Sequence, residues 1–503
     1  MIRQSGILLH ITSLPSRFGI GTLGKEAYRF IDFLYESGQT LWQILPIGPT
    51  GYGNSPYQGL STFAGNPYMI DIEQLVNEGL LEISEVIEAS SHSISEHVDF
   101  EYISRTRLPL LMKAAKRGYG QYGQEEISFY EDNKDWLPDY ALFQAIRNHT
   151  GSCAFWEWPE DIRAHKPEAV ARYQEMYAED IRCLSFLQFL FDRQWRDMKD
   201  YAEEHHVEII GDIPIYTAQD SADLWSHPEL FQLGEDGMPS SVAGVPPDYF
   251  SADGQLWGNP LYDWDAMKES GYTWWIRRLE KALERHDYIR IDHFRGFAGY
   301  YSIPAGSKTA ANGEWKKGPG MELFRALKEH VSLEALIAED LGILDDPVRA
   351  LLKTTGLPGM KVLLFGFGGN DSEYLCHHYT ENCVAYIGTH DNETFLGWLS
   401  NPKTPKADRE KAFRYLRLSE KEGYGWGAIS TLMGSIASKT VFQMQDILGL
   451  DNYARMNTPA TTDGNWDWRM REDVLTKTLA DRLAEYTKTY ARCQRFTEEA
   501  PSS

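Results

Sequence analysis

Short, nearly continuous apolar segments bounded by glycine or proline recur along the whole chain, and segments with helical periodicity separate them. The apolar segments cover residues 6–14, 40–47, 207–215, 288–292, 335–341, 360–367, 383–389 and 440–446. Strands that are apolar on both faces are typical of a parallel sheet with helices on both sides. Eight of them in alternation with helices predict a closed (β/α)8 TIM barrel, an α/β fold.

The helical patterns also predict where the chain departs from a plain barrel. Periodic apolar positions predict helices over 322–331 and 167–201, and we expect the second to break or bend because of its length. The interval between the second and third strands far exceeds one crossover helix. Patterns at 105–116 and 136–148 therefore predict a helical insertion over approximately 70–200.

Two further insertions are expected. Residues 218–264 are rich in Gly, Pro, Asp and aromatic residues without periodicity, which is typical of a loop-rich subdomain beside a site. We place this insertion at approximately 217–285, after the third strand, and a smaller one at approximately 396–440. The whole chain, 1–503, is interpreted as a single barrel domain enlarged by its connections.

Charge excludes two classes of partner. The chain has 49 Lys and Arg against 73 Asp and Glu, a formal net charge of −24. A surface this acidic repels phosphate backbones and anionic lipid headgroups, so neither nucleic acid nor a membrane is expected as a partner. The aromatic content of 13% is on the high side. We expect much of this excess in a ligand cleft.

The sequence predicts a soluble protein of the cytoplasm. It has no run of about 18 apolar residues, and its first residues lack the apolar stretch and cleavage site of a signal peptide. Five scattered cysteines without a CxxC pair suit a reducing compartment and indicate neither a disulfide framework nor a zinc knuckle. We expect a monomer or a small homo-oligomer.

Four acidic residues stand at or just after the carboxyl ends of separate predicted strands, where TIM barrels carry their catalytic groups. They are Asp212, Asp292, Glu339 and Asp391. Arg290 shares a strand face with Asp292. We expect both to point into the barrel, with the arginine lowering the pKa of the aspartate; a plain buried ion pair is the alternative. Spacing leaves open whether Glu339 or Asp340 faces the interior.

These carboxylates favour cleavage of a glycosidic bond. An ionised and a protonated carboxyl group flanking the bond supply a nucleophile or base and an acid. The run PPDYFSADGQLWGNP, residues 246–260, adds rings that cover pyranose faces and amides that bond hydroxyls. These are Tyr249, Phe250, Trp257, Gln255 and Asn259. Its Gly, Pro and Asp content argues against a regular element, and a plain loop with buried anchors is the alternative.

Three histidines near strand ends, His10, His293 and His390, raise the alternative of a metal site. No HxH or HExxH spacing supports it, and continued extended geometry would place His293 on the opposite strand face from Asp292. We therefore predict no metal and no other cofactor. His390 is interpreted as a hydrogen-bonding residue that acts on sugar hydroxyls.

Five motifs carry a resemblance to a known family. They are SPYQGLSTFAGNPY at 55–68, PPDYFSADGQLWGNP at 246–260, RIDHFRGF at 290–297, IAEDLG at 337–342 and GTHDNET at 388–394. Together they resemble the amylomaltases, also called disproportionating enzymes or 4-α-glucanotransferases, of the α-amylase clan. The resemblance extends over 6–466, and the second motif is far more specific than any single acid.

The resemblance implies a (β/α)8 barrel with inserted subdomains and no C-terminal β-sandwich domain. It implies Asp292 as the nucleophile, Glu339 as the general acid/base and Asp391 as the transition-state stabiliser, which selects Glu339 over Asp340. Phe250 is implied to lie on a loop that folds over the acceptor. The implied substrate-binding residues are Tyr57, Asp212, Phe250, Gln255, Trp257, Arg290, His390 and Asn465.

The implied activity is transfer of a segment of an α-1,4-linked glucan to the 4-hydroxyl of an acceptor glucose or maltodextrin. The implied route is a retaining double displacement through a covalent glycosyl-enzyme, and the implied partners are maltose, maltodextrins and amylose. A hydrolase of the same clan is the nearest alternative, because the acids alone do not choose between water and a sugar acceptor. A non-catalytic glucan-binding protein and a metal enzyme are the others.

Overall fold

The centre of the protein is a sheet of eight parallel strands in a computed structural model that describes residues 3–87, 90, 95–247, 253–342, 344–369 and 371–498. The strands are β1 (Gln4–Leu8), β2 (Leu41–Gln43), β3 (Glu208–Pro214), β6 (Tyr288–Asp292), β9 (Leu336–Ala338), β10 (Gly359–Val362), β11 (Cys383–Tyr386) and β12 (Lys439–Gln443). Each of the eight predicted apolar segments contains or overlaps one of them, so the predicted strands are confirmed.

Spatial order follows chain order around the sheet, as a (β/α)8 barrel requires. The neighbours run β10–β11–β12–β1–β2–β3–β6–β9, and the two ends meet where the Ala338 N–H donates to the Pro358 carbonyl at 2.9 Å. Gly6 lets β1 and β2 approach, because a Cβ at that position would lie 2.2 Å from the Leu41 carbonyl oxygen. The predicted barrel is confirmed.

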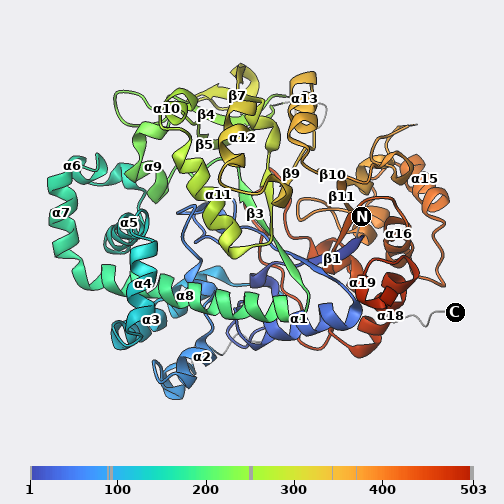
Figure 1. Ribbon diagram of the computed structural model, residues 1–503, viewed down its shortest axis with the longest axis horizontal. Helices are drawn as coiled ribbons and strands as arrows, with labels where there is room; N and C mark the ends of the chain where they lie inside the picture. The colour runs from blue at the N-terminus through green and yellow to red at the C-terminus, as the bar shows by residue number, and fades with distance from the viewer. Residues whose placement is uncertain are drawn as a thin grey trace.

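Helices cover the outside of the barrel (Figure 1). Those that precede β4 are α1 (Lys25–Ser37), α2 (Ile72–Asn77), α3 (Phe100–Gly118), α4 (Gln124–Asp132), α5 (Leu137–His149), α6 (Glu160–Arg163), α7 (Pro167–Met176), α8 (Ala178–Glu204) and α9 (Ala222–Ser226). The later ones are α10 (Trp264–Glu269), α11 (Thr273–Arg285), α12 (Met321–Lys328), α13 (Asp346–Thr355), α14 (Phe395–Ser400), α15 (Lys406–Leu416), α16 (Tyr424–Met433), α17 (Met444–Leu448), α18 (Lys477–Thr489) and α19 (Gln494–Glu498).

The chain between β2 and β3 holds the helices α2 to α8. Figure 1 shows α3 to α7 gathered at one end of the molecule, with α8 running back from them to α1. The expected break in the 167–201 pattern is confirmed at Tyr177, whose φ of −109° and ψ of 24° interrupt the helical run between α7 and α8. The helices predicted at 105–116 and 136–148 lie within α3 and coincide with α5.

A second, antiparallel sheet stands over the barrel. It consists of β5 (Gln255–Pro260), β4 (Ser241–Val245), β7 (Gly299–Pro304) and β8 (Glu314–Lys317) in that order, and Figure 1 shows β4, β5 and β7 together at the top. The second half of the PPDYFSADGQLWGNP run is thus a strand, which corrects the expectation of no regular element. Cross-strand pairing with β4 supplies the order that local composition does not predict.

Helix α11 shows how the sequence holds a strand end in place. Its Trp274 and Trp275 are buried, and the buried Arg278 donates to the carbonyls of Pro214, the last residue of β3, and of Ile215, the residue after it. Burial lowers the pKa of Arg278, and the neighbouring Tyr262 and Asp223 oppose this effect. The ring of Trp275 also lies 4.7 Å from the guanidinium, within the range of a cation–π contact. The end of β3, next to Asp212, is thereby anchored.

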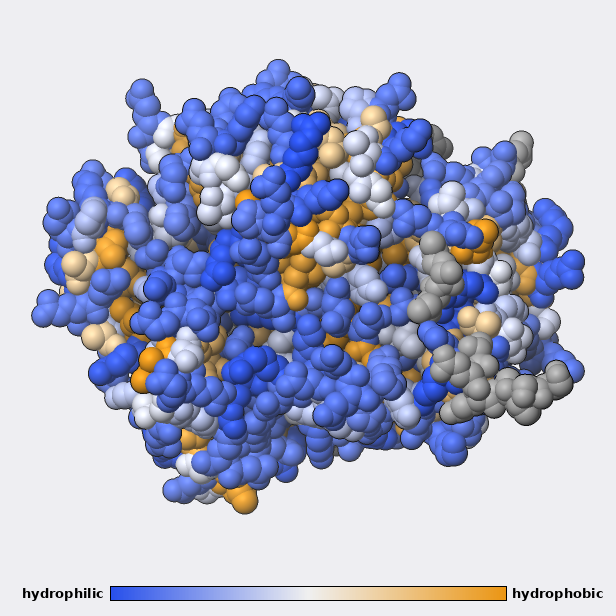
Figure 2. Space-filling model, in the orientation of Figure 1, coloured by the Kyte–Doolittle hydropathy of each residue, from blue (hydrophilic) through white to orange (hydrophobic). Residues whose placement is uncertain are grey.

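The surface agrees with a protein that keeps its apolar side chains inside. On the face in Figure 2, hydrophilic residues cover most of the surface and hydrophobic residues appear in smaller groups between them. Within the described ranges, no helix is long and apolar enough to cross a membrane. The described chain after β12 continues with helices and short turns, in agreement with the expected lack of a C-terminal β-sandwich there.

Candidate active site

A cleft of about 640 Å³ opens at the carboxyl ends of the barrel strands. Asp292, Glu339 and Asp391 all line it, together with Arg290. Their strands are β6, β9 and β11, and each acid stands at the last residue of its strand or up to five residues beyond it. The barrel thus brings together acids that lie up to a hundred residues apart in the chain, as predicted.

Arg290 is the centre of an ion-pair network below the cleft. Its Nη1 donates to both oxygens of Asp212 at 2.9 and 2.8 Å, and its Nη2 donates to Asp292 Oδ1 at 3.0 Å. Arg290 and Asp212 are directly opposite in the β3–β6 ladder, so their side chains share a face. The predicted inward pairing of Arg290 and Asp292 is confirmed, and Asp212 is the second partner that neutralises the buried guanidinium.

The pKa of Asp292 differs from the expectation. Burial raises it to about 6, and although the Arg290 guanidinium lowers it, desolvation together with Asp212 and Asp391 outweighs that effect. The expectation that the arginine leaves a net lowered pKa was therefore wrong. The arginine acts in the expected direction, but a carboxylate that shares its cation with a second carboxylate receives only part of the stabilisation.

Glu339 and not Asp340 faces the cleft. Its Oε2 accepts from the His293 N–H and its Oε1 accepts from the Leu341 N–H, both at 2.7 Å. Burial first, and then repulsion from Asp292, raise the pKa of Glu339 to about 7. Asp340 instead accepts from the Met360 N–H at the start of β10. One carboxyl group is therefore adapted to carry a proton near neutral pH.

Asp391 remains ionised for a different reason. Burial would raise its pKa, but the neighbouring His390 and the hydrogen bond that Asn457 Nδ2 donates to Oδ1 at 2.6 Å outweigh burial and lower the pKa below its ordinary value. Arg455 donates to the Asp391 carbonyl at 2.6 Å and fixes the backbone. The cleft thus holds one permanently charged carboxylate beside a pair with raised pKa values.

His390 and Tyr57 connect Asp391 to the arginine network. The Tyr57 hydroxyl donates to Asp212 Oδ2 at 2.8 Å and lies 2.8 Å from His390 Nε2, which is 3.4 Å from Asp391 Oδ2. The two rings stack with centroids 5.2 Å apart. Tyr57, Asp212 and His390 therefore form one connected hydrogen-bonded group, although they come from segments far apart in the sequence.

His293 does not continue the extended geometry of β6. Its φ of 55° and ψ of 49° are left-handed, so its ring lines the cleft and lies 4.7 Å from the ring of Trp257. The expectation that it faces away from the site was therefore wrong. This turn directs the His293 N–H at Glu339, and the hydrogen bond between them helps to hold the rarely populated backbone conformation of His293. Such conformations occur at functional sites, where the surrounding structure stabilises them.

The other predicted substrate-binding residues are placed differently from one another. Gln255 and Trp257 line the cleft, with Trp257 Nε1 donating to Gln255 Oε1 at 3.1 Å. Asn465 is buried beside the cleft: it accepts from the Thr458 N–H and donates to Thr461, so it supports a cleft-lining segment. Its contact with glucose stays a prediction. Phe250 lies outside the described residues.

Several cleft residues escaped the sequence reasoning. Asn457, which bonds Asp391 from 66 positions away, carries no motif signal. Trp315, Phe365 and Trp466 line the cleft from separate connections. Seven described aromatic side chains of the Phe, Trp and Tyr type line the cleft, which is fewer than expected, because tryptophans such as Trp42, Trp195 and Trp275 are fully buried in the core.

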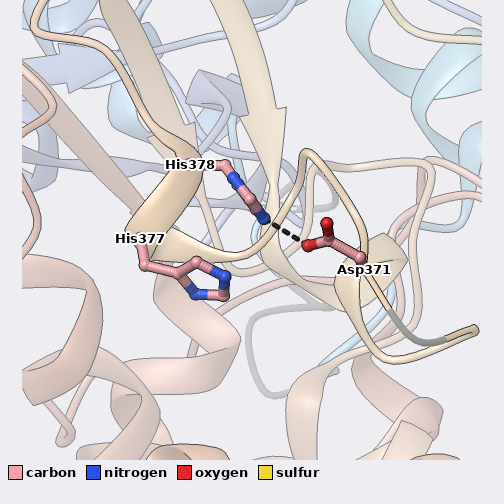
Figure 3. Close-up of side chains that lie close together, drawn as sticks. All are labelled: Asp371, His377 and His378. Carbon is pink, nitrogen blue, oxygen red and sulfur yellow. Dashed lines mark hydrogen bonds and ion pairs between the residues drawn. The ribbon is translucent and has the colours of Figure 1, made fainter.

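A possible metal-ligand cluster lies outside the cleft. In the described ranges, Asp371, His377 and His378 are the one group of three such side chains whose ligand atoms lie within 4.8 Å of each other, and all are exposed. Figure 3 shows the His378 ring pointing to Asp371, while His377 Nδ1 lies 3.0 Å from the Tyr415 hydroxyl. The cluster is a hydrogen-bonded His378–Asp371 pair with a neighbouring histidine on the surface.

Comparison with known proteins gives one consistent result. The 4-α-glucanotransferase family model matches residues 9–476. A 4-α-glucanotransferase of Clostridium butyricum is 45% identical over 97% of this chain and 100% of its own, and one of Streptococcus pneumoniae is 46% identical over 97% of each. The amylomaltase of Streptococcus agalactiae, solved in complex with acarbose, has a TM-score of 0.93 at 42% identity, covering 98% of this chain and 100% of that one.

The fold, the acids at the barrel's carboxyl end and these similarities agree. The resemblance read from the five motifs is confirmed over nearly the whole chain. The chain belongs to the 4-α-glucanotransferase family.

Proposed function

We propose that the cleft transfers α-1,4-glucan segments by a retaining double displacement, with Asp292 as the nucleophile, Glu339 as the general acid/base and Asp391 as a stabiliser of the transition state. The arrangement of the three carboxyl groups around one cleft carries this proposal. The directions of the pKa shifts support these roles: the pKa of Asp391 is lowered, while the pKa values of Asp292 and Glu339 are raised to about 6 and about 7.

The first displacement breaks the glycosidic bond of the donor. An Asp292 carboxylate oxygen attacks the anomeric carbon while Glu339 passes its proton to the departing glycosidic oxygen. The product is a β-linked glycosyl ester of Asp292 and a shortened glucan. Arg290, bonded to Asp292 Oδ1, keeps the nucleophile oriented. Asp391, which lines the same cleft beside His390, supplies a carboxylate for the developing positive charge, and His390 supplies a hydrogen bond to the sugar.

The second displacement restores the α-linkage. Glu339, now ionised, removes the proton of the incoming 4-hydroxyl as its oxygen attacks the anomeric carbon, and the Asp292 ester bond breaks. Aromatic side chains along the cleft, among them Trp257, Trp315 and Phe365, offer flat surfaces to glucose units of donor and acceptor. Neutral glucans bind through such rings and through hydroxyl contacts, so the net negative charge of the protein does not oppose their binding.

Incubation of the purified protein with maltotriose alone tests the proposal. Transfer between sugar acceptors yields a ladder of longer and shorter maltodextrins, seen by chromatography of reaction products over time. Release of glucose and maltose without longer chains would instead show a hydrolase. Binding of maltotriose with no change in chain length would show a non-catalytic glucan-binding protein.

The pH profile follows from the two raised pKa values. Asp292 must be ionised to attack, so kcat/KM falls as the pH drops through about 6, and Glu339 must be protonated, so kcat/KM falls as the pH rises through about 7. We expect a narrow bell with its maximum between these values, measured with maltotriose at constant ionic strength. Because the two carboxyl groups interact, the apparent values belong to the pair. A flat profile from pH 5 to 9 would contradict the assignment.

The segment around Phe250 is proposed to cover the acceptor and keep water from the glycosyl-enzyme. The flanking Pro246 and Gln255 line the cleft, which supports this placement. We expect Phe250→Ala to raise glucose release relative to oligosaccharide exchange severalfold, measured by glucose assay and chromatography of the same reaction. An unchanged ratio would show that this segment does not keep water from the glycosyl-enzyme.

The cellular setting is part of the same proposal. We infer a cytoplasmic enzyme of maltodextrin, glycogen or starch metabolism that acts as a monomer or a small homo-oligomer. The composition and the scattered cysteines support this inference. Light scattering of the purified protein and fractionation of its source cells test these two points.

A further inference from the structure

A small cavity lined by buried residues lies behind His390, beneath the cleft. Its polar lining consists of His10, Ser13, His390, Gln443 and Gln445, and the rest is apolar. The five side chains come from the segments after β1 and β11 and from the end of β12 and the start of α17, so the barrel closes around it. The cavity is part of the barrel interior and is not one of the sugar-binding surfaces described above.

Four polar atoms on this lining are buried without a hydrogen-bond partner among the described residues: Ser13 Oγ, His390 Nδ1, and Oε1 and Nε2 of Gln443. The three residues are between 0% and 3% exposed. Isolated buried polar atoms are unfavourable and are rare in folded proteins. Their convergence on one cavity indicates a ligand that can both donate and accept.

The size of the cavity identifies that ligand. About 10 Å³ is open to it, the space that a single water molecule occupies, and a buried water typically makes two to four hydrogen bonds. We propose that the cavity binds one structural water that hydrogen-bonds His390 Nδ1, Ser13 and Gln443, and that Ser13 and Gln443 are thereby positioning residues for His390. The role given to His390 rests on the proposed function.

The hydrogen bonds of His390 Nε2 determine whether the water donates to or accepts from His390 Nδ1. The Tyr57 hydroxyl has one proton, which it donates to Asp212 Oδ2, so it accepts from His390 and the imidazole proton lies on Nε2. In the neutral ring Nδ1 is then an acceptor. The water donates one hydrogen to Nδ1 and the other to Gln443 Oε1, and it accepts from the Ser13 hydroxyl, so it gives a partner to three of the four atoms and leaves Gln443 Nε2 outside the arrangement.

His10 adds no positive charge to this arrangement. Its Nδ1 accepts from the Leu45 N–H at 3.2 Å, so its own ring proton lies on Nε2. Burial lowers the pKa of His10 to about 3, which keeps its ring neutral. With Nδ1 of His390 held by the water, Nε2–H stays directed at Tyr57 and Asp391, where the reacting sugar binds. Outer hydrogen bonds of this kind fix both tautomer and ring orientation.

Nitrogen NMR on the full-length protein with 15N-labelled histidine tests the tautomer directly. His390 is assigned by the signal pair lost in His390→Asn. We expect the wild-type ring to show a protonated Nε2 and an unprotonated, hydrogen-bonded Nδ1. In Gln443→Glu, whose carboxylate places a negative charge at the cavity and favours the imidazolium, we expect a proton on Nδ1 as well. A wild-type ring protonated on Nδ1 alone, or on both nitrogens, would overturn the proposal.

Activity provides the second measurement. We expect Gln443→Leu to lower kcat for maltotriose about 10- to 100-fold with KM within about twofold, the usual effect of losing a partner behind a site residue, and Ser13→Ala to act in the same direction. Gln39→Leu and Ser5→Ala are matched controls, because both residues are equally buried and do not line the cavity. Unchanged kcat together with unchanged His390 signals would overturn the proposal.

If the variants fail to fold, a crystal structure of the wild-type protein at near-atomic resolution tests directly whether the water is present. We expect one water within hydrogen-bond distance of His390 Nδ1, Ser13 Oγ and the Gln443 amide, and an empty cavity would overturn the proposal. The water and the tautomer are measured on the wild-type protein without turnover. Incubation with maltotriose that yields no ladder of longer and shorter chains would therefore contradict the proposed function. It would not bear on the water or the tautomer, which are measured separately.

Discussion

Replacing Asp292 by asparagine is expected to reduce kcat for maltotriose disproportionation by about 10⁴-fold or more, because an amide cannot form the glycosyl ester. We expect the fold to survive, since Arg290 keeps both hydrogen bonds to Asp212. Thermal unfolding and maltotriose binding, measured on the same preparation, separate loss of chemistry from loss of structure. Asp265→Asn, at an exposed position on α10, is the matched control.

A chemical rescue distinguishes a nucleophile from a merely structural carboxylate. In Asp292→Gly, azide can enter from the face that the carboxylate occupied and attack an α-maltosyl fluoride donor. The expected product is β-maltosyl azide, with fluoride as the leaving group and the opposite anomeric configuration to the donor. Formation of α-maltosyl azide, or full activity of Asp292→Asn, would show that Asp292 does not form the covalent bond.

Replacing Glu339 by glutamine is expected to lower kcat for maltotriose about 10³-fold, because general acid and base assistance are both lost. Glutamine can still accept one of the two backbone hydrogen bonds, from His293 or from Leu341, so the local fold should be retained. The alkaline limb of the pH profile should disappear with the group of raised pKa. Glu329→Gln, exposed at the end of α12, is the matched control.

The leaving group reveals which half of the reaction Glu339 serves. Fluoride departs without a proton, so we expect Glu339→Gln to react with α-maltosyl fluoride far faster than with maltotriose. The second displacement lacks its base, so the maltosyl ester should accumulate and appear as a mass increase on the peptide that contains Asp292. An equal loss with both donors would argue that Glu339 does not donate the proton.

Much of the barrel was predictable because its signal is local. The run Tyr288–Asp292 reads as a strand from its own residues, and its alternation predicted that Arg290 and Asp292 share a face. The break between α7 and α8 was predictable from length. The strand β5 was not, because its order comes from pairing with β4 and composition favoured a loop.

Parts of the site depend on contacts that no local pattern reveals. Asn457 reaches Asp391 across 66 positions. Burial, reinforced by the charges of Asp212 and Asp391, raises the pKa of Asp292 although Arg290 lowers it. His293 itself adopts a left-handed backbone conformation that turns its ring into the cleft, and the sequence of the strand does not predict this turn. Each of these features depends on the residues that surround a group in the folded protein.

By itself, the sequence determined the eight strands, the acids at their carboxyl ends and the family, because periodicity and contiguous motifs are properties of short segments. Only the tertiary structure decided that Glu339 faces the cleft with a pKa raised to about 7 while Asp340 accepts a hydrogen bond from β10, and that His390 stands between Tyr57 and a buried polar cavity. Protonation and tautomer depend on burial and on partners within hydrogen-bond distance. Those partners meet only when the barrel closes.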